Sequence, residues 1–270
     1  MKRVIFPIMM FMLMVNAAYP ADVPVIGFLS RLNTSEEEFT RIVQNAQRAG
    51  SWRMLSNRHD VYGVKFYDSL TAMQMALMKG DIDEMALPEV AGEYVDAQDQ
   101  RIEVCCVSRT KASMGLALGF LKENAALAEK FNSALRAMRE DWSLAELQGI
   151  YIHNKDKAKP VKFSTFKGAQ TVKVAVTGDF PPIDYVDAGG NAAGFNAALL
   201  AELGRRMKVN IKLVNIEAGA RTSALASGRA DAVFWFETSE SGTWKYDSPE
   251  GVLLSEPYYN WSKFVHIRKR

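Results

Sequence analysis

The sequence predicts an α/β protein with two similar halves, because one pattern of helix and strand occurs twice. In each half an apolar helix ends at a glycine, Gly80 or Gly228, and an aspartate follows three residues later, just before an apolar strand. A strand followed by a helix precedes each pattern, at residues 23–49 and 172–207. Alternation of this kind is typical of α/β folds, and its repetition indicates two lobes.

The composition is that of an ordinary globular protein. The 270 residues are 48% hydrophobic and 24% charged, enough for a sizeable core in one or two domains. The formal net charge is only +2, and no basic patch or arginine-rich helix stands out. We therefore expect no nucleic-acid partner, and we expect a monomer.

Residues 1–21 have the features of a secretory signal peptide. Lys2 and Arg3 precede an apolar run at residues 4–15, and the alanines within 15–17 and 18–21 offer small-residue cleavage sites. A membrane anchor is the alternative, but the apolar run is short for a bilayer span. We expect the segment to be cleaved on export. No cysteine lies near the cleavage site, which argues against a lipoprotein anchor.

The stretch 171–207 predicts a strand, a loop and a helix beside a ligand site. Valines alternate with other residues at 171–176, and residues 179–182 interrupt the strand with two prolines. Apolar residues then recur every four positions at 195–207, as on one face of a helix. Ligands of open α/β sheets bind at the carboxyl ends of strands, so Phe180 is a candidate contact.

The polar turn before the first helix is a candidate anion site. Thr34 with Glu37, or Ser35 with Glu38, fits a capping box that opens this helix. The free N–H groups at a helix N-terminus attract anions, and Arg31 adds a charged donor to the turn. A well-capped helix with no ligand is the alternative.

The rest of the chain is read from apolar runs and turn residues. Helices are expected at 70–78, 123–139 and 144–150, and a lysine-rich linker with Pro160 at 154–170. The remaining strands are expected at 61–67, 102–107 and 112–120.

The cysteines and histidines give no metal or cofactor signal. Cys105 and Cys106 are adjacent in a strand, so their side chains should point to opposite faces as small core residues. A strained disulfide between these neighbours is the alternative. His59, His153 and His266 stand alone, without the spacing of metal ligands. We expect no metal and no cofactor.

Several segments resemble the bacterial family 3 solute-binding proteins, the periplasmic amino-acid receptors of ABC importers. The stretches VKVAVTGDFPPIDYVDAGGNAAGFNAALLAEL, ALASGRADAVFWFETSE and LLSEPYYNWSKFVHIRK resemble the first lobe of that family. The N-terminal half, from VIGFLSRLNTSEEEF through GLALGFLKENAALAEKFNSALRAMREDWSLAELQGIY, resembles the second lobe and then the family's C-terminal end. The resemblance therefore covers nearly the whole mature chain, in swapped order.

This order implies a two-lobed periplasmic binding protein-like (type II) fold that is circularly permuted. Compact folds tolerate permutation because their termini are often close together. Two tandem degenerate domains are the alternative. The implied divisions are a signal peptide at 1–21, second lobe at 22–110, return strand and helices packing on the first lobe at 111–153, permutation linker at 154–170, first lobe at 171–263 and crossover strand at 264–270.

The resemblance also assigns candidate ligand contacts. Phe180 matches the aromatic residue that stacks on the ligand, Thr238 matches a ligand-binding hydroxyl, and Tyr258 belongs to the aromatic pair before the crossover. The full set of candidates is Phe180, Tyr185, Trp235, Glu237, Thr238 and Tyr258 from the first lobe, with Arg31, Asn33, Thr34 and Glu89 from the second.

The chain departs from the family where an amino acid's charges are bound. Thr243 stands in place of the arginine that binds the α-carboxylate, and Pro88, followed by Glu89, stands in place of the aspartate that binds the ammonium. Bulky Phe236 replaces a glycine. Because an unmatched buried charge costs several kcal/mol, we expect a larger aromatic or apolar ligand, with at most one anionic group, or no ligand.

The resemblance implies a periplasmic protein that closes two lobes on its ligand and is recognised by a membrane permease. One alternative is an adaptor or sensor component without a ligand. Another is an enzyme similar to the periplasmic dehydratases that resemble this family, with Glu237, Glu240 or Glu89 as acid or base. No catalytic constellation is evident, so we expect no enzyme activity.

Overall fold

The computed structural model describes residues 23–32, 34–48, 62–154, 158–239 and 250–270. The predicted signal peptide, Asn33, His59, Glu240 and Thr243 lie outside these ranges, as does the side chain of Trp235. Within the described ranges, no helix combines the length and the apolar character needed to cross a bilayer.

One mixed sheet runs through the molecule, with the strand order β2-β1-β3-β12-β4-β10-β5-β9 and β11 attached to β4. Parallel pairs lie at both ends, β1 with β2 and β3, and β5 with β9 and β10, while β12 and β4 run antiparallel to their neighbours. The strands are β1 (Val25–Leu29), β2 (Gly63–Tyr67), β3 (Glu84–Pro88), β4 (Ile102–Leu121), β5 (Thr171–Val176), β9 (Asn210–Asn215), β10 (Ala232–Ser239), β11 (Val252–Leu254) and β12 (Tyr259–Lys269).

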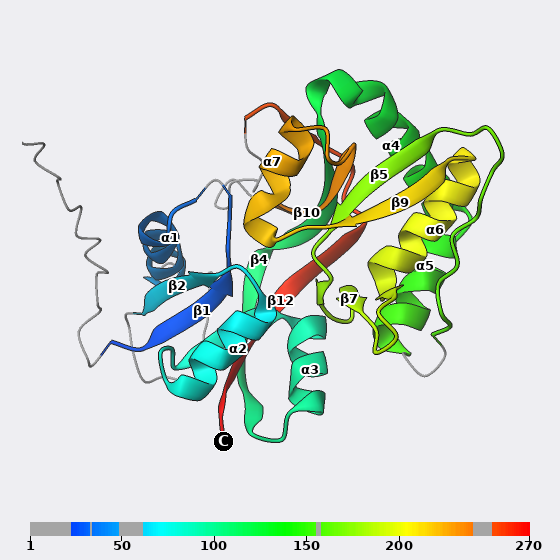
Figure 1. Cartoon of the computed structure of the whole chain (residues 1–270). Helices are drawn as coiled ribbons and strands as arrows, with labels where there is room; N and C mark the ends of the chain where they lie inside the picture. Colours follow the sequence, from blue (N-terminus) through cyan, green and yellow to red (C-terminus); the bar gives the residue numbers. More distant parts are fainter. Residues whose placement is uncertain (1–22, 33, 49–61, 155–157, 240–249) are drawn as a thin grey trace, which may run out of the picture.

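Two long strands, β4 and β12, connect the two lobes (Figure 1). Near its start β12 pairs with β4 in the first lobe, where Trp261 faces Met114, and near its end it pairs in the second lobe, where Lys269 faces Ile102. The prediction of separate strands at 102–107 and 112–120 is wrong, because β4 is continuous. Its polar residues 108–111 resemble a loop in sequence, but they lie where the strand passes from one lobe to the other.

Helices cover the sheet in both lobes (Figure 1). The second lobe carries α1 (Glu36–Arg48), α2 (Leu70–Lys79) and α3 (Glu89–Gln98). The first lobe carries α4 (Ala125–Glu140), which follows a 3-10 turn at Lys122–Asn124, α5 (Ser143–Gln148), which runs into a π turn at Gly149–His153, α6 (Phe195–Met207) and α7 (Arg221–Ala226). A small sheet, β6 (Asp179–Phe180), β7 (Asp184–Val186) and β8 (Ala192–Ala193), precedes α6. The predicted helices are confirmed, with ends shifted by a few residues.

Helix caps explain where α1 begins and where α2 begins and ends. The Ser35 hydroxyl accepts from the Glu38 N–H at 3.1 Å, which is one of the two hydrogen bonds of the predicted Ser35–Glu38 capping box. Ser69 caps α2 in the same way through Ala72. Gly80 ends α2 with φ 85, a left-handed conformation that glycine adopts without steric cost.

The first-lobe core explains the substitution of phenylalanine for glycine at position 236. Phe236 is fully buried against the neighbouring strand, and a Cβ on Gly119 would lie 2.1 Å from its ring. The large residue on β10 thus requires the small one on β4. Phe236 is a core residue of the first lobe.

Candidate ligand site between the lobes

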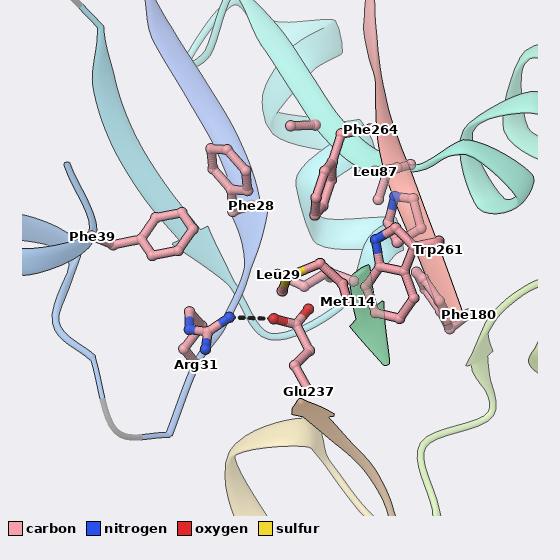
Figure 2. Close-up of a pocket in the computed structure, with 12 residues that line it drawn as sticks. Phe28, Leu29, Arg31, Phe39, Leu87, Met114, Phe180, Glu237, Trp261 and Phe264 are labelled. Carbon is pink, nitrogen blue, oxygen red and sulfur yellow. Dashed lines mark hydrogen bonds and ion pairs between the residues drawn. The ribbon is translucent and has the colours of Figure 1, made fainter. Parts of the chain in front are cut away.

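An ion pair joins the two lobes at the centre of the site (Figure 2). Arg31, in the turn after β1, donates from Nη1 to Oε2 of Glu237 on β10. Both side chains are largely withdrawn from solvent, with 6% of Arg31 and 22% of Glu237 exposed. The Arg31 guanidinium also lies over the Phe39 ring, 5.5 Å from its centre. The predicted anion-binding arginine therefore already contacts a carboxylate of the same chain.

A small apolar cavity adjoins this pair. Its volume is about 20 Å³, enough for roughly one water molecule. Apart from Arg31 and Glu237, its lining is apolar and comes from both lobes: Phe28, Leu29, Phe39, Ala86, Leu87, Pro88, Met114, Phe180, Trp261 and Phe264. Figure 2 shows that Phe180 and Trp261 lie on the same side of this cavity. Of the aromatic residues predicted to contact a ligand, Phe180 is the one that lines this cavity among the described side chains, and in this closed arrangement the cavity has no space for a larger molecule.

Three further contacts cross between the lobes. The N–H of Leu70, at the start of α2, donates to the Asp179 carboxylate at 3.2 Å. Arg221 Nη2 donates to the Ser30 carbonyl at 3.2 Å. The ring of Tyr185 lies 6.3 Å from that of Tyr94 on α3. Together with the Arg31–Glu237 pair, these two hydrogen bonds and one ring contact join the lobes directly.

A polar groove of about 370 Å³ lies beside the Asp179 contact. Asp68 and Ser69 from the second lobe face Thr177, Asp179, Asn215, Glu217 and Arg229 from the first. Burial raises the pKa of Asp179 above its usual value, against the hydrogen bonds that favour its charged form. The groove is polar where the cavity beside Arg31 is apolar, so the lobe interface has two chemically distinct parts.

The remaining predicted contacts lie away from the apolar cavity's lining. Tyr258 is buried in the first-lobe core, where its ring packs against Phe234 at 5.1 Å. Glu89 accepts from Lys263 Nζ at 2.7 Å. Thr238 and Thr34 are both buried. The structure thus brings together Phe180, Glu237 and Arg31, and places Tyr185 at another contact between the lobes.

A buried carboxylate that the sequence did not reveal supports the loop before Phe180. Asp184 accepts from the N–H groups of Thr177 and Gly178, at 3.1 and 3.0 Å, and is 5% exposed. Burial raises its pKa to about 6, despite these hydrogen bonds. The only sequence signal is its place after the two prolines, where an aspartate can bond back to the turn.

A second polar cluster lies in the second lobe. The ring of His266 is fully buried, with Nε2 3.0 Å from Ser108 Oγ and Nδ1 3.1 Å from Glu84 Oε2. The hydrogen-bonded row of Ser108, His266 and Glu84 resembles a catalytic triad. However, Ser108 is fully buried and offers no surface to a substrate. Glu84, Cys106 and His266 also present possible metal-ligand atoms within 4.8 Å of one another. No local sequence pattern indicates this cluster, because its residues lie on three different strands, β3, β4 and β12.

Residues 172–270 match the family model described as bacterial extracellular solute-binding proteins, family 3. The match covers less than half of the 270 residues, so it shows that this segment is similar to that family. The match contains the first-lobe strands and helices from β5 onward, Phe180 and Glu237 of the site, and the crossover strand β12. The sequence resemblance and the two-lobed binding-protein fold are therefore confirmed. No curated protein matches the chain.

Solved structures of binding proteins are similar to the chain only at low identity. The ligand-binding component of an ABC-type import system from Staphylococcus aureus, with zinc bound, is 11% identical over 92% of this chain and 66% of its own, with a TM-score of 0.43. The binding protein AgaA in complex with agropinic acid, from A. tumefacien R10, is 9% identical over 82% and 61%, with a TM-score of 0.40. The ancestral amino-acid-binding protein AncCDT-1, a precursor of cyclohexadienyl dehydratase, is 15% identical over 92% and 82%, with a TM-score of 0.40. The chain thus spans about two thirds or less of the first two structures.

Proposed function

We propose that this protein is a solute-binding component of an ABC-type importer, with a small ligand that is aromatic or apolar and carries one anionic group. The observation that carries the proposal is the Arg31–Glu237 pair beside an apolar cavity. In the bound state an anionic group of the ligand takes the place of Glu237 at Arg31. Phe28, Phe39 and Phe180 then supply the apolar surroundings that such a ligand requires.

Ligand entry requires the lobes to separate, because the cavity holds only about 20 Å³. Separation breaks the Arg31–Glu237 pair and the contact between Leu70 and Asp179, and it bends β4 and β12 where they connect the lobes. A ligand that reaches Arg31 restores the lost charge pairing, so the closed form with ligand is favoured. A membrane permease is the partner that recognises this closed form.

The circular permutation is also part of this proposal. Ile26 of β1 faces Glu84 of β3, and Met85 of β3 faces Ile267 of β12. The start of β1 and the end of β12 therefore lie at the same end of the strands, with only β3 between them. This corresponds to a separation of about 10 Å. This proximity is what the junction of an unpermuted chain requires, and residues 154–170 are the proposed linker between the original ends.

A second candidate function is an adaptor or sensor component that works without a ligand. The observation that favours it is the direct contact between the lobes, through Arg31 with Glu237 and through Asp179 with Leu70. In this case the closed form is the resting form, and Glu237 serves permanently as the partner of Arg31. The dehydratase-like alternative receives less support, since Glu237 and Glu89 are both in ion pairs.

A thermal-shift screen separates these functions. The purified protein is heated with aromatic carboxylates such as benzoate and phenylacetate, with standard amino acids, and with inorganic phosphate or sulfate. The proposal predicts that aromatic carboxylates raise the melting temperature and that Arg31→Ala removes the rise. Stabilisation by amino acids alone contradicts the proposed ligand class. No stabilisation by any compound favours the adaptor.

A further inference from the structure

Cys105 and Cys106 lie on the same side of β4, contrary to the sequence prediction. Opposite them on β12, His266 pairs with Cys106 whereas Ile267 pairs with Val104, so Cys105 is the extra residue of a β-bulge. In a regular strand the two side chains would point to opposite faces. The bulge removes this alternation, and the two sulfur atoms lie 3.3 Å apart.

The surroundings hold both thiols in place. Cys105 is partly exposed and donates from Sγ to the backbone carbonyl of His266 at 3.4 Å. Cys106 is buried, and its sulfur lies within 4.8 Å of possible ligand atoms on Glu84 and His266. The His266 ring is itself held by Ser108 and Glu84. The Cys105 thiol is therefore accessible to a reagent, and the Cys106 thiol lies beside the polar side chains of Glu84 and His266.

We propose that Cys105 and Cys106 are a redox pair that forms a reversible disulfide between neighbouring residues. The oxidant is an external disulfide, on a thiol–disulfide exchange protein or a small molecule such as oxidised glutathione. The Cys105 thiol loses its proton and its thiolate attacks one external sulfur, which releases the first external thiolate. The Cys106 thiolate then attacks Cys105, which releases the second external thiolate, and the two protons end on these products.

The geometry of neighbouring residues makes such a bond reducible. Consecutive Cα atoms are about 3.8 Å apart, whereas most disulfides join Cα atoms separated by about 4.4–6.8 Å. A bond closed over the shorter distance is strained, and strained disulfides are more easily reduced. The pair is therefore suited to a reversible switch rather than to a permanent crosslink.

Oxidation changes the contact between the strands that connect the lobes. The disulfide has no S–H, so the hydrogen bond from Cys105 to the His266 carbonyl is lost. The bulge lies in the β4–β12 pair, and this same pair continues into the first lobe. The oxidation state of the two cysteines is thus linked to the strands that must bend when the lobes separate.

The hydrogen bond to Cys106 and burial both raise the pKa of the Cys105 thiol. The nearby Glu84 carboxylate also raises this pKa, and the Arg268 guanidinium lowers it. A metal ion is a less suitable occupant of this cluster, because both ring nitrogens of His266 already have partners.

Thiol trapping tests the proposal. The purified chain is equilibrated at alkaline pH with a series of reduced-to-oxidised glutathione ratios and a metal chelator, then alkylated and weighed by mass spectrometry. The expected oxidised product has lost two hydrogen atoms and carries no alkyl group, and dithiothreitol returns it to the doubly alkylated form. Cys105→Ser and Cys106→Ser each remain open to alkylation or take up one glutathione.

Two results would overturn the proposal. One is a wild-type chain that stays doubly alkylated at every glutathione ratio. The other is a wild-type chain that carries glutathione on a cysteine as its end product. Thermal unfolding of both serine variants checks that they fold, and the wild-type trapping result decides the question even if a variant does not.

Discussion

Arg31 and Glu237 are 206 positions apart in the chain, and they form an ion pair that joins the two lobes. The arginine is the more buried partner, with 6% of its side chain exposed against 22% for the glutamate. The loss of stability should therefore depend on which of the two side chains is removed. Removal of the carboxylate leaves a buried cation without this counter-charge, whereas removal of the arginine leaves a carboxylate that water can reach.

Glu237→Gln should destabilise the protein more than Arg31→Met does. Breaking a buried ion pair from one side costs about 3–5 kcal/mol. The cost is smaller when the residue left without its partner is the more exposed one, as Glu237 is here. Urea denaturation of both single variants and of the double variant measures the difference. A double variant as unstable as the sum of the two single variants would mean that the residues do not interact.

Glu237→Gln should also bind anions better. Without the competing carboxylate, an aromatic carboxylate reaches Arg31 with about tenfold higher affinity, equivalent to about 1.4 kcal/mol. Isothermal titration calorimetry with benzoate or phenylacetate provides the measurement, and Arg31→Met in the same background is the control. Equal affinities of Glu237→Gln and the wild-type protein would exclude Glu237 as a competitor.

Asp184 should make the protein more stable at mildly acidic pH. Its folded-state pKa, about 6, is above the ordinary aspartate value of about 4, so its favourable contribution is complete below the ordinary value and is lost as pH rises through about 6. The loss between those limits is of the order of 2–3 kcal/mol. Asp184→Asn keeps an acceptor for Thr177 and Gly178 and should flatten this part of the curve of unfolding free energy against pH. If the curve of Asp184→Asn matches that of the wild-type protein, Asp184 is not the group that causes this pH dependence.

Two glycine substitutions should have opposite effects. Gly119→Ala places a Cβ 2.1 Å from the Phe236 ring, and such overpacking costs about 1–3 kcal/mol. Gly149→Ala meets no atom within 4 Å and keeps an ordinary helical φ of −56, so it should stabilise the protein by about 0.4–1 kcal/mol. Chemical denaturation measures both. A neutral Gly119→Ala would show that Phe236 can move aside.

Restoring the proposed original chain order should give a folded protein. A linker of about four to six residues joins residue 270 to residue 23, and new termini are opened within residues 158–165, which carry no helix or strand. Because only the connections change, the rearranged protein should keep the melting temperature within a few degrees and the same response to ligands. An insoluble or unfolded product would count against the permutation.

Local patterns predicted many of the helices and strands, but they missed α3 and β9 and did not give the contacts between elements. The strand at 171–176 and the helix at 195–207 follow from valine alternation and a four-residue apolar repeat, and both are confirmed. The continuity of β4 was missed because residues 108–111 are polar, as in a loop. The bulge at Cys105 was missed because it depends on pairing with β12, which no local pattern records.

The candidate site was predictable only in part. Phe180 and Arg31 line the cavity, and both followed from residues at the ends of predicted strands. Glu237 was named as a ligand contact, but charge pairing across 206 positions is a property of the folded chain. The aromatic residues Phe28 and Phe264 were missed because an apolar residue in a strand has the same pattern whether it faces a core or a cleft.

The strand β12 has a consequence for the order in which the lobes can assemble. It lies between β3 and β4 at the middle of the second-lobe sheet, yet it is the last described strand of the chain. During synthesis, the second lobe emerges first with a gap where β12 belongs, while the first lobe can form its own sheet from a nearly continuous stretch. The lobe made first is therefore completed last, and β3 presents an unpaired edge to other chains until the C-terminal residues arrive.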